Sequence, residues 1–173
     1  MTDTTATARR DGPQRHRADF PDGTVVFLIG MRINRLRSVR AWLPVFAAMP
    51  KMLKELFRHP ELGLLEARST WAGRNFTVIQ YWESMDKLMT YAASRDHAHL
   101  PAWKAFNRMT REAGDVVGIW HEAYEAGPQR SHIVYRSMPP FGMGKATRRR
   151  PDREMPPQPI PSRLAPERAE HAA

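Results

Sequence analysis

Apolar residues recur along this chain with two spacings, one typical of strands and one typical of helices. Residues 24–33, 75–83 and 115–125 carry apolar or aromatic side chains at both alternating sets of positions, which predicts strands that are covered on both faces. Residues 62–71 predict a further strand, joined to the one at 75–83 by a short hairpin with glycine at Gly73. Four strands are therefore expected.

Apolar residues at intervals of three and four predict helices between these strands. The longest such stretch, residues 39–58, is strongly amphipathic, with Ser38 as the expected cap and Pro50 as an expected kink or break. Ser84 is expected to cap a second helix that ends near residue 94. A third helix is expected from about residue 99 until Gly114 stops it.

The order of these elements is strand, helix, strand, strand, helix in two pieces, strand. It predicts an α+β fold of the ferredoxin-like βαββαβ type, an antiparallel sheet with helices on one face. Because the strands are apolar on both faces, the bare face needs a cover, and the pattern predicts a homodimer in which two sheets form an α+β barrel. The domain is expected to span 24–143, between a disordered tail at 1–23 and a basic, Pro/Arg-rich disordered tail at 144–173.

The net charge of +9 raises the question of a nucleic-acid partner. The densest basic cluster, Arg148–Arg150, lies beside prolines in the predicted tail, where a solvated, solubilising role is the simpler interpretation. The chain has no helix-turn-helix, zinc-finger or RNA-recognition signature. A nucleic-acid partner is therefore not expected.

Cysteine usage and apolar run length limit the possible compartments and chemistries. The chain has no cysteine, which excludes disulfides, thiol catalysis and thiolate metal sites. No apolar run reaches the length of about 18 residues that a membrane span needs. The amino-terminal residues lack the apolar segment of a secretory signal, so a cytoplasmic protein is expected.

Four segments together carry a resemblance to a known group of proteins. They are 76–82, 99–107, 117–124 and 135–142. The chain resembles bacterial proteins described as monooxygenase-like, within the dimeric α+β barrel superfamily. The resemblance implies a homodimer with a cavity between sheet and helices in each subunit. That superfamily includes cofactor-independent antibiotic-biosynthesis monooxygenases, haem-degrading monooxygenases, haem-dependent dehydratases and non-catalytic sensors.

The resemblance also implies a candidate haem site. In haem-degrading relatives the axial histidine lies on the helical segment near which His97 and His99 fall here. Two features depart from that pattern: Tyr91 stands where those relatives have tryptophan, and Pro101 falls where their helix continues. The expected cofactor is therefore either none or haem.

Two neighbouring histidines and one isolated histidine are candidates for chemistry. His97 and His99 are two residues apart, but a zinc site needs a third ligand that is not evident nearby, so no metal site is predicted. His99 is read either as a haem ligand or proton carrier or as a residue that packs beside Trp103 at a helix start. His121 interrupts an apolar strand, so it is either a base facing the cavity or a satisfied histidine at the dimer seam.

The remaining candidates would bind substrate. Aromatic and amide side chains near these histidines could orient an aromatic molecule: Gln80, Trp82, Tyr91, Trp103 and Asn107, with Tyr81. Glu66 and Arg32 would join His121 if the strand register places them beside it. The alternative for the tryptophans is that they only fill a core.

The predicted function is a small homodimeric monooxygenase-like enzyme that acts on an apolar or aromatic small molecule, with His121 or His99 moving the proton. The chain shows no nucleotide-binding glycine loop and no Gly-x-Ser-x-Gly nucleophile motif. Oxidation would thus use oxygen directly with an activated substrate, or a bound haem. The alternative is a haem- or small-ligand-binding dimer without catalysis, or a haem-dependent enzyme of the same superfamily.

Overall fold

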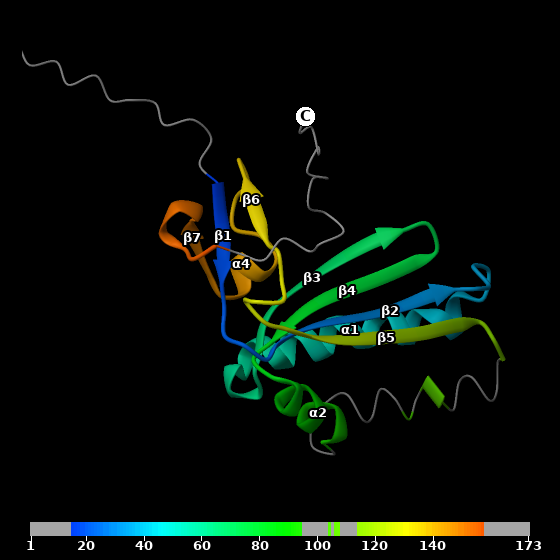
Figure 1. Ribbon diagram of the computed structural model, residues 1–173. Helices are drawn as coiled ribbons and strands as arrows, with labels where there is room; N and C mark the ends of the chain where they lie inside the picture. Colours follow the sequence, from blue (N-terminus) through cyan, green and yellow to red (C-terminus); the bar gives the residue numbers. More distant parts are fainter. Residues whose placement is uncertain (1–14, 95–103, 105, 108–113, 158–173) are drawn as a thin grey trace, which may run out of the picture.

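The computed structural model describes residues 15–94, 104, 106–107 and 114–157 of the chain. Its main sheet has four antiparallel strands in the order β3-β4-β2-β5. The elements that build this half of the fold are β2 (Thr24–Ile33), α1 (Val39–Arg58), the 3-10 turn η1 (Pro60–Leu62), β3 (Leu64–Ala72), β4 (Asn75–Trp82), α2 (Met85–Ala93) and β5 (Val117–Ala126). The order confirms the predicted ferredoxin-like α+β fold, and the predicted bounds of β2 and α1 match the structure (Figure 1).

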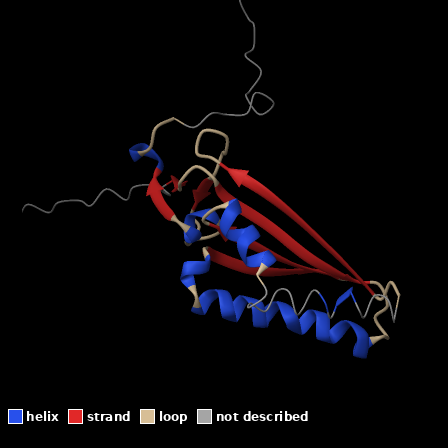
Figure 2. Cartoon of the chain, turned by 90° about the horizontal axis from the view of Figure 1, so that it is seen from below, coloured by secondary structure: helices blue, strands red, loops and turns tan. Residues whose placement is uncertain are grey.

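The two described long helices lie on one face of this sheet (Figure 2). Leu56 of α1 and Leu88 of α2 pack with Val25 of β2 and Trp82 of β4 in one buried cluster. A second cluster, around Met31, joins the far end of β2 to the first turns of α1. The face that carries Val25, Trp82 and Met31 is called the helix-facing side below.

The helix ends differ in part from the sequence predictions. The Ser84 hydroxyl accepts a hydrogen bond from the backbone N–H of Lys87 at 3.2 Å, which confirms the predicted cap of α2. Ser38 stands at the predicted N-cap position of α1, but its hydroxyl makes no cap hydrogen bond. The break predicted at Pro50 is also absent, because α1 continues through it as one helix.

A second, three-stranded sheet stands at one end of the main sheet (Figure 1). It has the order β6-β1-β7, made of β6 (Val134–Arg136), β1 (Arg15–Asp19) and β7 (Arg148–Pro151), and it is accompanied by α4 (Met143–Ala146) and the 3-10 turn η2 (Asp152–Glu154). Disorder was predicted for 1–23 and 144–173, and this prediction is wrong for the segments that form β1 and β7. They are short and rich in arginine, so they lack the apolar alternation by which strands are recognised.

The small sheet covers part of the main sheet's outer side, the side away from the helices. Tyr81 of β4 packs there with Phe20, Tyr135 and Met143, all of which are buried. The cover that the sequence assigned to a second subunit is thus supplied in part by the chain itself.

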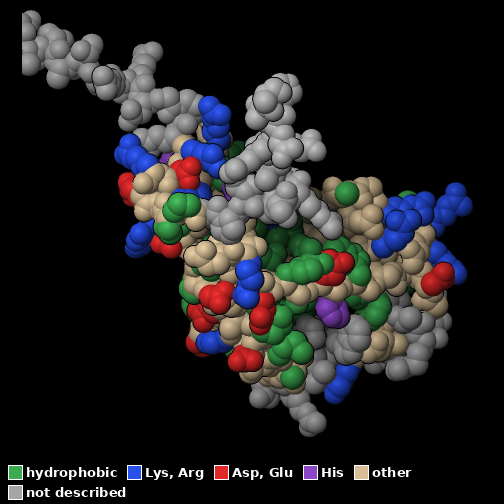
Figure 3. Space-filling model, viewed as in Figure 1, with side chains coloured by type: hydrophobic (Ala, Val, Ile, Leu, Met, Phe, Trp, Pro, Cys, Tyr) green, Lys and Arg blue, Asp and Glu red, His purple; other side chains and the backbone are tan. Residues whose placement is uncertain are grey.

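The described residues leave the rest of the outer side uncovered. Trp120 and Tyr124 of β5 lie on it with 36% and 54% of their surface exposed. A Cβ at Gly30 would lie 2.5 Å from Nε1 of Trp120, so this strand position needs glycine beneath the indole ring. Figure 3 shows apolar side chains gathered over the strands in the middle of this view.

A search of the described helices found none that is both long enough and apolar enough to cross a membrane.

Candidate functional site

The strand register places the side chains of Gln80, Phe27 and His121 together on the helix-facing side. Gln80 of β4 pairs with Phe27 of β2, and His121 of β5 pairs with Ile29 of β2. Paired residues of antiparallel strands share one face, so Gln80, Phe27 and His121 point to the same side as Trp82. The ring centres of Phe27 and His121 are 5.9 Å apart. The sequence left open whether His121 faces the cavity or the dimer seam. His121 lies on the helix-facing side, and it is exposed.

Gln80 is held by the indole two residues further along β4. Nε1 of Trp82 donates a hydrogen bond of 2.8 Å to Oε1 of Gln80, and both residues are buried. The Trp82 ring lies 5.7 Å from the ring of Tyr91. Three of the predicted substrate-binding residues are thus in one buried cluster.

Tyr91 extends this cluster to helix α1. Its hydroxyl donates a hydrogen bond of 3.0 Å to Oε2 of Glu55. Burial of the phenol, assisted by the Glu55 carboxylate, raises the pKa of Tyr91 well above its ordinary value of about 10. Tyr91 consequently stays protonated, and it acts as a donor to Glu55 rather than as a base.

Three other predicted residues lie on the outer side. Tyr81 alternates with Gln80 along β4, and burial raises its pKa, with the Arg68 guanidinium opposing the rise. Glu66 pairs with Tyr81 in the register and forms an ion pair with Lys145 at 2.9 Å. Arg32 is an exposed residue on the same side. These residues do not join His121, because one step along a strand reverses the direction of the side chain.

The remaining predictions fall partly outside the described residues. His97, His99 and Trp103 lie outside them. Asn107 is helical and half-buried, and its neighbour Phe106 packs against the cluster around Met31. Asn107 therefore belongs to the end of the sheet where β2 finishes.

Two residues of the cluster were missed by the sequence analysis. Glu55 follows the buried Met52 by three residues, a spacing that places both on the same face of α1. The spacing could therefore have identified Glu55 as a residue that faces the sheet. Phe27 was recognised only as an apolar strand residue, and its place beside His121 required the register of β2 against β5.

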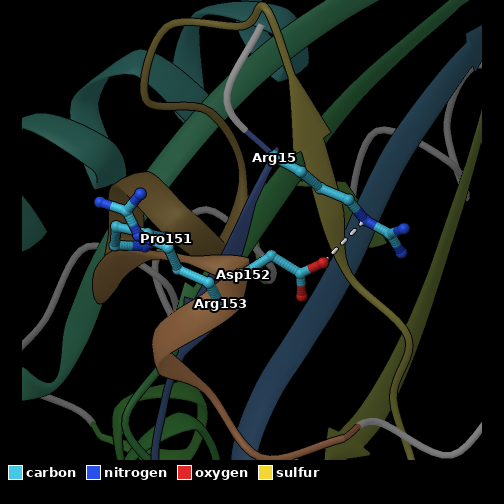
Figure 4. Close-up of a pocket in the computed structure, with 4 residues that line it drawn as sticks. All are labelled: Arg15, Pro151, Asp152 and Arg153. Carbon is cyan, nitrogen blue, oxygen red and sulfur yellow. Dashed lines mark ion pairs between the residues drawn. The ribbon is translucent and has the colours of Figure 1, made fainter. Parts of the chain in front are cut away.

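The described residues hold no evident metal site, and they form a pocket at the small sheet. The described residues contain no group of three His, Cys, Asp or Glu side chains that could hold a metal. A pocket of about 320 Å³ lies at the small sheet and is lined by Arg15, Pro151, Asp152 and Arg153. Figure 4 shows Arg15 and Asp152 extended toward each other, joined by an ion pair of 3.2 Å. Asp152 also pairs with Arg17, so its carboxylate is already used within the fold.

Comparison with known proteins identifies the family of this chain. A family model described as monooxygenase af470-like matches residues 24–143. The chain belongs to this family. No curated protein sequence matches it. The matched span contains the Gln80–Trp82–Tyr91 cluster and His121, and it omits β1 and β7 of the small sheet.

Solved structures share the fold of this family member. An aldoxime dehydratase aligns with a TM-score of 0.59 at 19% identity, over 76% of this chain and 40% of that chain. The aldoxime dehydratase OxdRE, in complex with butyraldoxime, aligns at 0.54 and 16%, over 65% of this chain and 34% of that chain. SnoaB, a cofactor-independent oxygenase from Streptomyces nogalater, aligns at 0.44 and 14%, over 61% of this chain and 94% of that chain. The chain thus spans well under half the length of the two dehydratases.

Proposed function

We propose that this protein is a small homodimeric monooxygenase-type enzyme that acts on an apolar or aromatic small molecule bound between the sheet and its helices. The observation that carries the proposal is the position of His121, an exposed imidazole beside the Phe27 ring on the helix-facing side of the sheet. An imidazole next to an apolar wall can take a proton from a bound substrate near neutral pH. Membership of the monooxygenase af470-like family supports oxygen as the second reactant.

Each candidate residue has a role in this proposal. His121 is the base, and His99 is the second candidate for proton movement. Gln80, Trp82 and Tyr91 form the buried floor that positions the substrate. Trp103 remains a candidate for substrate contact, whereas Asn107, at the end of the sheet where β2 finishes, would contact only a substrate that extends along the sheet.

The proposed reaction uses the substrate itself as the source of electrons. Oxidation of a CH2 group to a carbonyl by O2 places one oxygen atom in the product and releases the other as water, and the carbon supplies all four electrons. His121 accepts the proton that leaves the carbon when the reactive carbanion forms. An electron-rich aromatic ring next to the CH2 group would stabilise that carbanion.

Oxygen uptake with a panel of hydroxylated aromatic compounds that carry a CH2 group next to the ring tests the proposal. We expect uptake with the wild type and a loss of about 100-fold or more in His121→Ala, the range associated with removing a general base. His132→Ala, which removes an exposed histidine from a loop, serves as the matched control and should behave like the wild type. Equal rates in His121→Ala and the wild type would exclude His121 as the base.

The alternative function is that of a haem-carrying dimer. Absorption spectroscopy distinguishes this alternative from the proposed cofactor-independent enzyme. A Soret band on addition of haem that disappears in His99→Ala would assign haem to the segment around His99. A wild type that shows no such band, and that consumes oxygen without added cofactor, would favour the cofactor-independent enzyme.

Dimerisation in this proposal uses the open part of the outer side. Trp120 and Tyr124 are large and exposed there, and a second sheet packed on them would remove their apolar surface from water.

A further inference from the structure

The loop between β6 and α4, residues 137–141, presents apolar side chains to solvent. Met138 is 44% exposed and Phe141 is 40% exposed. Pro139 and Pro140 between them are exposed as well. Single exposed apolar residues are common on protein surfaces, whereas neighbouring ones often mark a contact with another molecule or with a membrane.

Both ends of this loop are held by the fold. Ser137 has a φ of +54°, which residues other than glycine rarely adopt, directly after β6. Gly142 closes the loop with a φ of +55°, and a Cβ there would lie 3.0 Å from the Tyr81 hydroxyl. Two residues further, the backbone N–H of Gly144 donates a hydrogen bond of 2.9 Å to the Tyr135 hydroxyl. The apolar loop therefore has a fixed position on the surface.

Three arginine side chains surround the loop. Arg136 precedes it at the end of β6 and is exposed. The Arg149 guanidinium, on β7, donates a hydrogen bond of 2.5 Å to the backbone carbonyl of Met138. The Arg68 guanidinium, on β3, lies 4.0 Å from the centre of the Phe141 ring. None of the three arginines forms an ion pair with a described residue, so the loop is apolar at its centre and positively charged around it.

This combination is complementary to an anionic lipid surface. Such a surface takes apolar side chains at the boundary between headgroups and acyl chains, and its phosphate groups attract arginine. A nucleic acid would bind the arginines through its phosphates but would leave Met138 and the prolines without a contact. The proposed partner subunit packs on Trp120 and Tyr124 of β5, whereas Phe141 lies over β3, at the opposite edge of the sheet.

We propose that residues 136–141 and Arg149 form a docking surface for an anionic membrane, which the protein binds at its surface. Met138 and Phe141 enter the headgroup boundary, and the arginines bind lipid phosphates. Arg68 supports the ring of Phe141 from below through a cation–π contact. The surface lies on the outer side of the main sheet, away from the helix-facing cluster, so the inference does not depend on the proposed function.

Co-sedimentation with lipid vesicles tests the inference on the full-length protein. We would compare vesicles of phosphatidylcholine alone with vesicles of phosphatidylcholine and phosphatidylglycerol in equal parts. The wild type should bind the mixed vesicles about tenfold more tightly or better, because the phosphatidylglycerol headgroup adds negative charge. Added salt should weaken this binding, because it screens exposed charges.

Two double variants test the two parts of the surface. Arg136→Gln with Arg149→Gln should weaken binding to the mixed vesicles by about tenfold or more, because two charges near the lipid phosphates are lost. Met138→Ser with Phe141→Ser should weaken it by a similar factor, because the apolar side chains that enter the boundary are lost. Circular dichroism would confirm that each variant is folded.

Matched controls lie near the start of α1, at the end of the main sheet opposite the small sheet (Figure 1). Arg37→Gln with Arg40→Gln removes the same charge from exposed positions. Leu36→Ser with Leu43→Ser removes apolar side chains that are 49% and 48% exposed. Both controls should bind the mixed vesicles nearly as tightly as the wild type.

The outcomes separate the membrane from other partners. Equal binding of the wild type to the two kinds of vesicle, or an unchanged affinity in either double variant of the loop, would overturn the inference. Binding of oligodeoxythymidylate that the arginine variant loses and the serine variant keeps, without vesicle binding, would assign the surface to nucleic acid instead. A dimer that the serine variant loses, without vesicle binding by the wild type, would assign the loop to a contact between subunits.

Discussion

Gln80 and Arg17 are both polar side chains with almost no exposed surface, but their surroundings differ. The Arg17 guanidinium donates to the backbone carbonyl oxygens of Pro156, Asp152 and Met155 at 2.6–3.0 Å, and it also pairs with the Asp152 carboxylate. Its donors are used within the fold, so Arg17 has a structural role. Gln80 accepts a hydrogen bond from the indole N–H of Trp82 inside the helix-facing cluster, so it belongs to the candidate site.

Replacing Arg17 should destabilise the small sheet. Arg17→Met removes a buried guanidinium that donates to three backbone carbonyls and pairs with the Asp152 carboxylate, at an expected cost of about 2–4 kcal/mol. Arg15→Met removes an arginine that pairs with the same carboxylate but whose side chain is 52% exposed, and it should cost less than about 1 kcal/mol. Hydrogen exchange of residues 148–151 and urea unfolding measure both effects. Equal losses in the two variants would contradict the structural role.

Tyr91→Phe should lower stability in a pH-dependent way. At pH 7 the variant loses the hydrogen bond to Glu55, at an expected cost of about 1–2 kcal/mol. Because the folded-state pKa of Tyr91 is raised, the unfolded chain loses this proton first as the pH passes about 10, and the wild type is destabilised there. The Tyr91→Phe variant has no phenol to ionise, so the difference in free energy of unfolding between it and the wild type should become smaller above pH 10.

Denaturant unfolding at pH 7 and at several values above pH 10 measures this difference. Tyr124→Phe is the control, because Tyr124 also bonds to a carboxylate, that of Glu122, but at an exposed site. It should leave stability almost unchanged at every pH. A deficit for Tyr91→Phe that stays constant or grows in alkali would show that burial does not hold its proton.

The residues of the candidate site were predictable to different degrees. Gln80, Trp82 and Tyr91 could be named from the sequence because they interrupt or end apolar patterns. The face of the sheet on which His121, Glu66 and Arg32 lie could not be predicted. An alternating strand pattern shows which residues share a face, but it does not show which face meets the helices. Only the pairing of β2 with its neighbours decides that point.

At the scale of elements, local sequence signals were reliable where they coincide with long apolar patterns. β2 and α1 have the predicted bounds because each buries a long, regular set of side chains. β1 and β7 were missed because their stability comes from arginine contacts and from pairing between distant segments. Capping follows the backbone instead: Ser84 is extended, with φ −159° and ψ 165°, and caps α2, whereas Ser38, with φ −84° and ψ 51°, makes no cap bond although it precedes the longer helix.

The two serines make a matched test of helix capping. Ser84→Ala removes the acceptor for the N–H of Lys87 and should cost about 1 kcal/mol. Ser38→Ala removes a hydroxyl that makes no cap bond, so it should change the free energy of unfolding by a few tenths of a kcal/mol at most. Thermal or urea unfolding of the two variants gives the comparison. A loss at Ser38 as large as that at Ser84 would mean that the hydroxyl of Ser38 caps α1 in solution.

At the scale of the whole molecule, the described residues cover the outer side of the main sheet at one end. The small sheet and α4 bury Tyr81 and its neighbours at one end. Trp120 and Tyr124 remain exposed further along, and we propose that a second subunit packs on them. The dimer surface would therefore be smaller than the whole sheet face that the sequence pattern indicated.

A charge placed on the open part of the outer side should prevent dimerisation. Tyr124→Glu puts a second carboxylate beside Glu122 where the partner would pack, so the dimer should dissociate or weaken by 10-fold or more. Met89→Glu is the control, because Met89 of α2 is 60% exposed and lies elsewhere. Light scattering after size-exclusion chromatography measures the mass. A wild type that is monomeric at micromolar concentration would remove the dimer from the proposal.

The pairing of β1 with β6 and β7 also sets the order in which the protein can be completed during synthesis. β1 leaves the ribosome first, but its partners end at Pro151. At about 5–20 residues per second, β1 waits on the order of ten seconds for them. During that interval Phe20 and Tyr81 lack their cover. Nascent chains that stop before β7 should therefore bind chaperones.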